Sequence, residues 1–151
     1  MHAAGVRVSF VAANPSSYMY FTTDRPVQDD DATAPRCQGY NDYKYGLDGR
    51  NVYMRELTGQ QLGERYARRH VTYLLGTDDV HPNHDLDMSC KAMLQGEHRL
   101  ARGKNYYASI MKLFPYAVHE QIDVPGVGHD QEAMFSSEQG CAAIFGVSGK
   151  E

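Results

Sequence analysis

Three short apolar runs, separated by segments with helical spacing, constrain the fold of this 151-residue chain more than any other feature. Each run is rich in β-branched residues, as buried strands are. Strands that alternate with helices along a chain pair in parallel through right-handed crossovers. The sequence therefore predicts an α/β fold, with a parallel sheet flanked by helices in three layers. The predicted strands are Val6–Ala13, Val71–Leu75 and Val118–Val124, and the predicted helices are Tyr53–Arg69, Leu100–Leu113 and a terminal helix framed by Ala133–Phe145.

Capping residues predict where two helices begin. A helix is expected to start at Asp87–Cys90 with Asp87 as its N-cap, because a carboxylate accepts hydrogen bonds from the first helical amides. Ser136 or Ser137 is expected to cap the terminal helix, with Glu138 in its first turn, where a negative charge is favourable.

Length and composition indicate one folded domain over residues 1–151. The chain has room for one domain and little for a second, and 42% apolar and 23% charged residues are typical of globular proteins. Residues 16–50 are rich in tyrosine and lack sustained periodicity, which predicts a long loop excursion. The tyrosines from Tyr18 to Tyr45 indicate that the excursion is packed, and they also form a candidate recognition surface.

Charge and hydropathy argue against nucleic acid and membranes as partners. The formal net charge of −4 gives no reason to expect binding to nucleic acid or to an anionic membrane. No apolar run approaches the roughly 18–20 residues that span a bilayer. The first residues also lack the charged-then-apolar pattern of a signal peptide, so a cytoplasmic location is predicted.

The cysteine pattern is consistent with that location. Cys37, Cys90 and Cys141 are widely spaced and form no C-x-x-C unit, so neither a zinc knuckle nor a redox motif is predicted. Reduced thiols in a cytoplasmic protein are the simplest interpretation. One disulfide in an exported protein is the alternative.

A carboxylate and an imidazole follow the second and third predicted strands. Asp79 lies just beyond Val71–Leu75, and His129 lies in the glycine-containing segment Pro125–Asp130, beyond Val118–Val124. In open parallel sheets, functional residues lie just past the carboxyl ends of the strands. A carboxylate fixes the tautomer of an imidazole that acts as a general base and stabilises the imidazolium it becomes. The sequence predicts a catalytic pair, and a loop histidine beside a solvated turn is the alternative.

The nucleophile that such a pair would activate is not identifiable. No Gly-x-Ser-x-Gly motif, which would place a serine on a sharp strand-to-helix turn, occurs in the chain. Ser16 and Ser17 follow the first predicted strand and are the candidate nucleophiles within these residues. Because neither has flanking glycines, a hydrogen-bonding role in the wall of the site is the favoured interpretation.

A second polar cluster suggests a weaker, metal-dependent alternative. Imidazole and carboxylate side chains are ligands for divalent ions. Pro82 breaks the helix that would place two histidines on one face, so a polar turn is favoured and neither a metal nor a cofactor is predicted. The cluster consists of His81, His84, Asp85 and Asp87.

Five segments occur together in a recognisable order over nearly the whole chain. They are Val6–Tyr18, Cys37–Leu47, Tyr73–Asp79, Met93–Gly103 and Pro125–Asp130. Together they resemble the C-terminal half of bacterial α/β-hydrolase-fold proteins. The resemblance implies that the three strands correspond to the last three of that family's eight-stranded sheet.

The resemblance also implies roles for the polar residues. In that family the triad acid stands three residues after the glycine that ends its strand, which selects Asp79 over Asp78. His129 would be the triad base. The substrate class varies widely on this fold and is not implied by the resemblance; a small ester or amide is the leading hypothesis. The serine elbow and the oxyanion-hole loop of the family map to nothing in this chain, so it represents a truncated, esterase-like fold whose own activity is uncertain.

The first predicted strand suggests association with another chain. A three-stranded sheet that ends in the bare strand Val6–Ala13 exposes an apolar edge, which invites pairing. A homo-oligomer or a separate N-terminal half is therefore expected as partner. The alternative function, from a different class, is a non-catalytic binding or assembly module that uses this edge and the tyrosine-rich loop.

Overall fold

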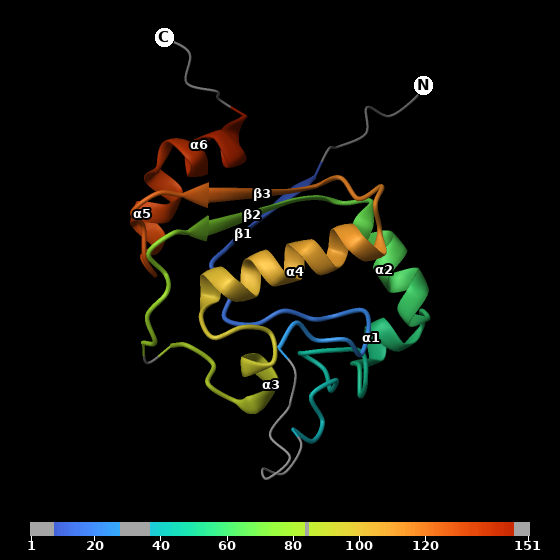
Figure 1. Ribbon diagram of the computed structural model, residues 1–151. Helices are drawn as coiled ribbons and strands as arrows, with labels where there is room; N and C mark the ends of the chain where they lie inside the picture. Colours follow the sequence, from blue (N-terminus) through green and yellow to red (C-terminus); the bar gives the residue numbers. More distant parts are fainter. Residues whose placement is uncertain (1–7, 28–36, 84, 147–151) are drawn as a thin grey trace, which may run out of the picture.

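The computed structural model describes residues 8–27, 37–83 and 85–146, and its elements follow the predicted alternation of strands and helices (Figure 1). Three parallel strands form one sheet in the order β1-β2-β3, which confirms the predicted α/β class. The strands are β1 (Ser9–Ala13), β2 (His70–Gly76) and β3 (His119–Val124). The helices are α1 (Val52–Arg55), α2 (Gly59–Ala67), α3 (Cys90–Met93), α4 (Arg99–Leu113), α5 (Gln131–Ser136) and α6 (Glu138–Phe145).

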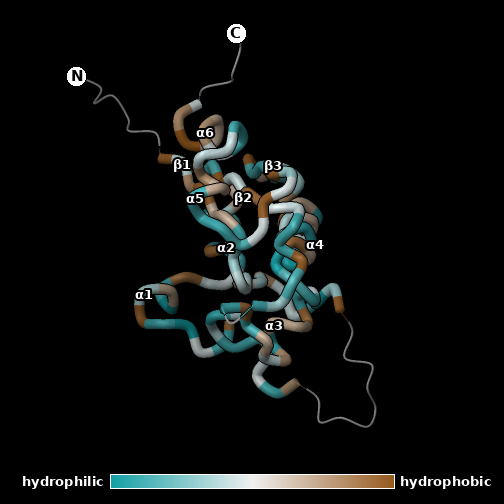
Figure 2. Tube along the Cα trace, turned by 90° about the vertical axis from the view of Figure 1, so that its left-hand side faces the viewer, coloured by the Kyte–Doolittle hydropathy of each residue, from teal (hydrophilic) through white to brown (hydrophobic). Residues whose placement is uncertain are grey.

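The sheet is covered on both faces. Figure 2 looks toward the carboxyl ends of the strands and shows α4 on one side of β2 and α5 with α6 on the other. Alternate residues of β2 explain this, because successive side chains of a strand point to opposite faces. Val71, Tyr73 and Leu75 pack with Tyr106 of α4, whereas Leu74 packs with Met134 of α5.

The first two predicted elements are shorter or divided in the structure. Strand β1 begins at Ser9, and Val6 and Arg7 of the predicted strand lie outside the described residues. The predicted helix Tyr53–Arg69 is wrong as a single helix, because Thr58 interrupts it. The Thr58 hydroxyl and the Gln61 side chain form a capping box, which starts α2 as a separate helix.

Two predicted caps have different outcomes. The N-cap of α3 is Ser89 rather than Asp87, whose carboxylate instead accepts hydrogen bonds from the Tyr45 hydroxyl (2.6 Å) and from the Ser89 amide (3.0 Å). Although burial opposes ionisation of Asp87, these hydrogen bonds lower its pKa to about 2. Ser137 caps α6 with Glu138 in the first turn, as one of the two predicted alternatives has it, but α5 is a separate helix before it.

The tyrosine-rich excursion is partly core. Tyr18 and Tyr20 are buried against Tyr106, with Tyr18 stacked on the Tyr106 ring at a centroid distance of 4.5 Å. The prediction of a packed excursion is confirmed for these two residues. For the same reason they cannot belong to a recognition surface, and that hypothesis is wrong for Tyr18 and Tyr20.

A disulfide joins Cys37 of the excursion to Cys90 of α3, with the two Cα atoms 5.8 Å apart. The prediction of reduced thiols is therefore wrong for this pair, while Cys141 is free. Sequence spacing could not reveal the bond, because the two cysteines are 53 residues apart and meet only after folding.

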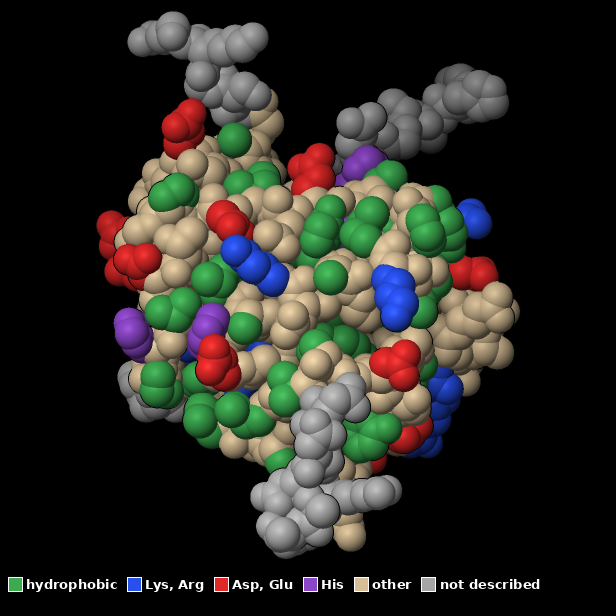
Figure 3. All heavy atoms as spheres, viewed as in Figure 1, with side chains coloured by type: hydrophobic (Ala, Val, Ile, Leu, Met, Phe, Trp, Pro, Cys, Tyr) green, Lys and Arg blue, Asp and Glu red, His purple; other side chains and the backbone are tan. Residues whose placement is uncertain are grey.

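Charge is mixed over the surface, and the helices are short. On the face shown in Figure 3, acidic and basic side chains are interspersed. Within the described ranges, no helix has both the length and the apolar character that a bilayer crossing requires.

A buried histidine links the sheet to α2. The Nε2 atom of His119 lies 3.0 Å from the Tyr66 carbonyl, and Nδ1 lies 3.0 Å from the Tyr73 hydroxyl. Because a carbonyl can only accept, Nε2 carries the proton and Nδ1 accepts from Tyr73, whose oxygen in turn accepts from the Tyr66 hydroxyl at 2.7 Å. This chain of hydrogen bonds is complete with a neutral imidazole.

We expect this histidine to make folding sensitive to acid. Burial lowers the pKa of His119, an effect that its hydrogen bond to the Tyr66 carbonyl partly offsets. Below the unfolded-state pKa of about 6.5 the unfolded chain binds the proton first, so the free energy of unfolding falls as the pH drops toward the folded-state pKa. Urea titrations between pH 8 and 5 should show this loss, and His119→Gln should flatten it. An equal slope in both proteins would contradict the prediction.

Candidate active site

The loops after β2 and β3 are joined to each other by backbone hydrogen bonds. The Thr77 amide donates to the Val124 carbonyl and the Asp78 amide to the Val127 carbonyl, both at 3.0 Å. Gly76 permits this close approach, because a Cβ atom there would lie 2.2 Å from the Val127 carbonyl oxygen. Gly126, with φ of +70°, turns the chain after β3. These contacts hold residues 76–79 beside residues 125–129.

Asp79 and His129 meet at this edge of the sheet. His129 Nδ1 lies 3.0 Å from Asp79 Oδ2. Asp79 is only 2% exposed, whereas the His129 side chain is 35% exposed. An ionised carboxylate can only accept, so Nδ1 carries the proton and Nε2 is left as the basic nitrogen. The sequence prediction placed these residues together, and the structure brings them together.

A buried arginine, which the sequence analysis missed, contacts the other oxygen of the carboxylate. Arg99, the first residue of α4, lies 3.4 Å from Asp79 Oδ1 through its Nη1 atom and is 1% exposed. Its Nη2 atom donates to Asn83 Oδ1 at 3.0 Å. The Asp79 carboxylate thus lies between an imidazole and a guanidinium, so its charge is compensated although it is buried.

Asn14 is a second residue that the sequence analysis missed. It follows β1 with a φ of 43°, in the left-handed region that asparagine tolerates better than most residues. Its Oδ1 atom accepts from the Gly76 amide at 2.9 Å, and its Nδ2 atom donates to the Gly128 carbonyl at 3.1 Å. Asn14 therefore ties the end of β1 to both loops that carry the pair. The position of Asn14 directly after a predicted strand is the sequence feature that could have identified it as a site residue.

A cavity of about 420 Å³ opens beside His129. Asn14 and Asp85 line one part of it, and Met134 and Phe135 of α5 line another. This volume lies within the range of pockets that hold small molecules. In the part of the chain that is described, His129 Nε2 has no hydrogen-bond partner, so it is available to a group in the cavity.

The candidate nucleophiles are not joined to this pair. The Ser16 hydroxyl accepts from the Asp87 amide at 2.7 Å and donates to the Asp85 carbonyl at 3.4 Å. Among the described residues, no hydrogen bond connects Ser16 or Ser17 with His129. Ser16 thus hydrogen-bonds the loop before α3, and it is not among the residues that line the cavity beside His129.

The metal alternative gains no support. His84 lies outside the described residues. Among the others, no group of three or more histidine, cysteine, aspartate or glutamate side chains is arranged to hold an ion.

Solved structures that resemble this chain include two enzymes. LpqC, a poly(3-hydroxybutyrate) depolymerase from Bordetella parapertussis, superposes with a TM-score of 0.61 and 28% identity over 89% of this chain. Poly(aspartic acid) hydrolase-1 from Sphingomonas sp. KT-1 superposes with a TM-score of 0.60 and 27% identity over 83% of it. The chain has a partial α/β-hydrolase fold.

The match covers a minor part of each neighbour. This chain spans 39% of the depolymerase and 41% of the polyaspartate hydrolase. No protein-family model matches the sequence, and a search of curated proteins found no match.

Proposed function

We propose that this chain carries the acid–base part of a site that hydrolyses esters or amides. His129 Nε2 takes the proton of a nucleophilic hydroxyl as its oxygen attacks the carbonyl carbon, and returns that proton to the leaving alcohol or amine. Asp79 holds the imidazole in the required tautomer and stabilises the imidazolium. The hydrogen bond between Asp79 and His129 beside an open cavity is the observation that carries the proposal.

The neighbours support the bond type. Poly(3-hydroxybutyrate) is joined by esters and poly(aspartic acid) by amides, and the two named enzymes act on these polymers. Acyl transfer through a nucleophile and a histidine base serves both linkages. A small ester or amide, or the end of such a polymer, is the proposed substrate.

The proposal places the nucleophile on a segment or partner that adds to β1. This strand pairs with β2 on one side only among the described strands. Phe10 in β1 is 43% exposed, and Val8, just before it, is 57% exposed. Addition of further strands there, from a second copy or from a separate N-terminal half, would cover these side chains and extend the sheet.

The same exposed edge is the specific observation that favours the second candidate function. A non-catalytic assembly module would use β1 as its contact and would have no need of the basic nitrogen of His129. The two functions therefore differ in what substitution of His129 does.

Hydrolysis of 4-nitrophenyl acetate tests the proposal, because this activated ester can be cleaved by water, from which His129 Nε2 takes a proton as general base, without a separate nucleophile. His129→Ala is expected to lower the rate about 100-fold, the lower end of what a general base contributes. Asp79→Asn should lower the rate too, because the carboxylate that fixes the tautomer of the His129 imidazole is lost. His70→Ala, at the exposed start of β2, is the matched control and should leave the rate unchanged.

Two results decide between the alternatives. An unchanged rate in folded His129→Ala would contradict the hydrolytic proposal and favour the assembly module. A fluorophosphonate adduct on the wild-type chain that disappears in His129→Ala would place the nucleophile within this chain, and would contradict its supply from outside.

A further inference from the structure

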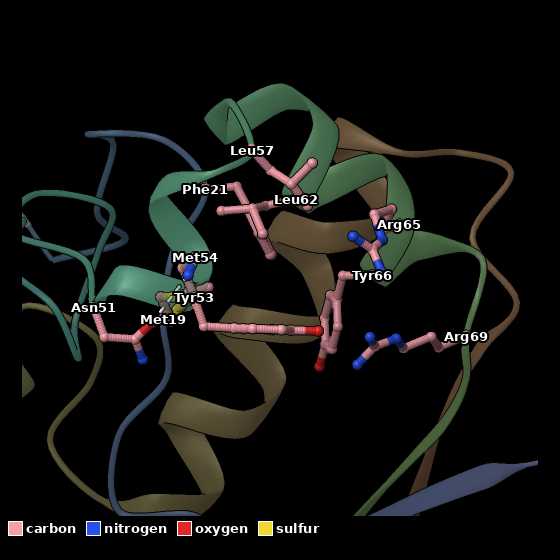
Figure 4. A pocket seen from close by; sticks show the side chains of 10 residues that line it. All are labelled: Met19, Phe21, Asn51, Tyr53, Met54, Leu57, Leu62, Arg65, Tyr66 and Arg69. Atoms are coloured by element: carbon pink, nitrogen blue, oxygen red, sulfur yellow. Dashed lines mark hydrogen bonds between the residues drawn. The ribbon is translucent and has the colours of Figure 1, made fainter.

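A second pocket, separate from the cavity beside His129, lies between α1, α2 and the start of the excursion (Figure 4). Its volume is about 270 Å³, and it shares no lining residue with that cavity. Phe21, Leu57 and Leu62 give it an apolar floor. Nothing in the proposed hydrolysis uses this pocket.

Two arginines stand at one side of this apolar pocket. Figure 4 shows Arg65 and Arg69 near the ring of Tyr66, with Met19 on the opposite side and the Tyr53 side chain reaching from there toward Tyr66. Arg65 lies near the end of α2, and Arg69 lies just beyond its C-cap; because both line one pocket, their like charges repel each other. Neither has a carboxylate partner within ion-pair distance in the described part of the chain, and the Arg69 guanidinium lies 5.5 Å from the centroid of the Phe10 ring.

Other arginines of the chain show how different this arrangement is. The guanidiniums of Arg99 and Arg102 are buried and hydrogen-bonded to protein oxygens. An exposed arginine needs no partner of its own. Two of them beside an apolar hollow, however, favour a ligand that offers a negative charge and an apolar body together.

We propose that this pocket binds a small carboxylate with an aromatic or alkyl body. The carboxylate lies between the guanidiniums of Arg65 and Arg69, where it offsets their repulsion, and the body packs on Phe21 and Leu62. The volume is near the lower limit for small-molecule pockets, which suits an acid of one or two rings. The proposal is independent of hydrolysis at His129.

The proposal is tested by calorimetric titration of the whole chain with 2-naphthoate and with 2-naphthamide, a neutral molecule of nearly the same shape. We expect the wild-type protein to bind the acid at least tenfold more tightly, and this preference to shrink as salt is raised. Arg65→Gln and Arg69→Gln should each weaken acid binding about three- to tenfold and leave amide binding unchanged, because partly exposed charge pairs contribute modestly.

A matched control lies between the two arginines. Arg68 faces a neighbouring hollow with Gln61 and Glu64 and does not line this pocket, so Arg68→Gln should leave both affinities unchanged. Leu62→Ser should weaken both probes, and circular dichroism checks that each variant is folded. Equal affinity for acid and amide, no binding of either, or an equal loss in Arg68→Gln would overturn the proposal.

Discussion

Removal of the Cys37–Cys90 disulfide is expected to lower the free energy of unfolding by about 4 kcal/mol. The bond closes a loop between cysteines 53 residues apart, and its loss returns the corresponding chain entropy to the unfolded state. Cys90→Ser and reduced wild-type protein should therefore unfold at similar, lower urea concentrations. Since most mesophilic domains are stable by only about 5–15 kcal/mol, this loss is a large share of the total.

The free cysteine provides the control for this experiment. Cys141→Ser removes a thiol without breaking a crosslink and should leave the unfolding midpoint of the oxidised protein unchanged. Added reductant should have no further effect on Cys90→Ser. If the oxidised and reduced wild-type proteins unfold at the same urea concentration, the bond does not contribute to stability.

The disulfide also bears on where the protein works. Disulfides persist in oxidising compartments and are rare in the cytosol. Because the structure contains this bond, we propose the exported alternative in place of the cytoplasmic location that the missing signal-peptide pattern predicted. Reduction would loosen the loop that Ser16 and Asp87 hold near the candidate site.

The sequence predicted what local patterns encode. Alternating apolar runs identified β2, β3 and α4 nearly to their ends, because period and turn signals are properties of neighbouring residues. Asp79 and His129 could be found because the ends of parallel strands collect functional side chains. The break before α2 could also have been predicted from the sequence, since Thr58 followed by Gln61 three residues later is a capping-box pattern.

The missed features depend on distances that no local pattern carries. Arg99 looks like an ordinary basic residue at the start of a helix until folding buries it beside Asp79. Asn14 becomes a link between loops only when residues 76 and 128 meet it. The Cys37–Cys90 bond likewise depends on the path of the whole excursion. Long-range polar partners are therefore the part of this site that only the folded structure reveals.

Substitution of Arg99 by methionine is expected to cost about 3–5 kcal/mol of unfolding free energy. Methionine fills much of the same space, but the buried Asp79 carboxylate loses the guanidinium at 3.4 Å and keeps only the His129 imidazole. Removal of one partner of a buried ion pair leaves a charge that is poorly compensated and strongly destabilising. Urea unfolding at pH 7 measures the loss directly.

A double-mutant cycle separates this effect from lost packing. Asp79→Asn alone should also be destabilising, because it leaves the Arg99 guanidinium buried without a carboxylate. Combined with Arg99→Met, it should cost about 2 kcal/mol less than the sum of the two single changes, since no buried charge is then left unpaired. Arg68→Met, on the exposed end of α2, should change stability by less than about 0.5 kcal/mol. Additive costs in the cycle would mean that Arg99 stabilises the fold through packing and not by compensating Asp79. The charge of the Asp79 carboxylate, which orients His129, would then be compensated by the imidazole alone.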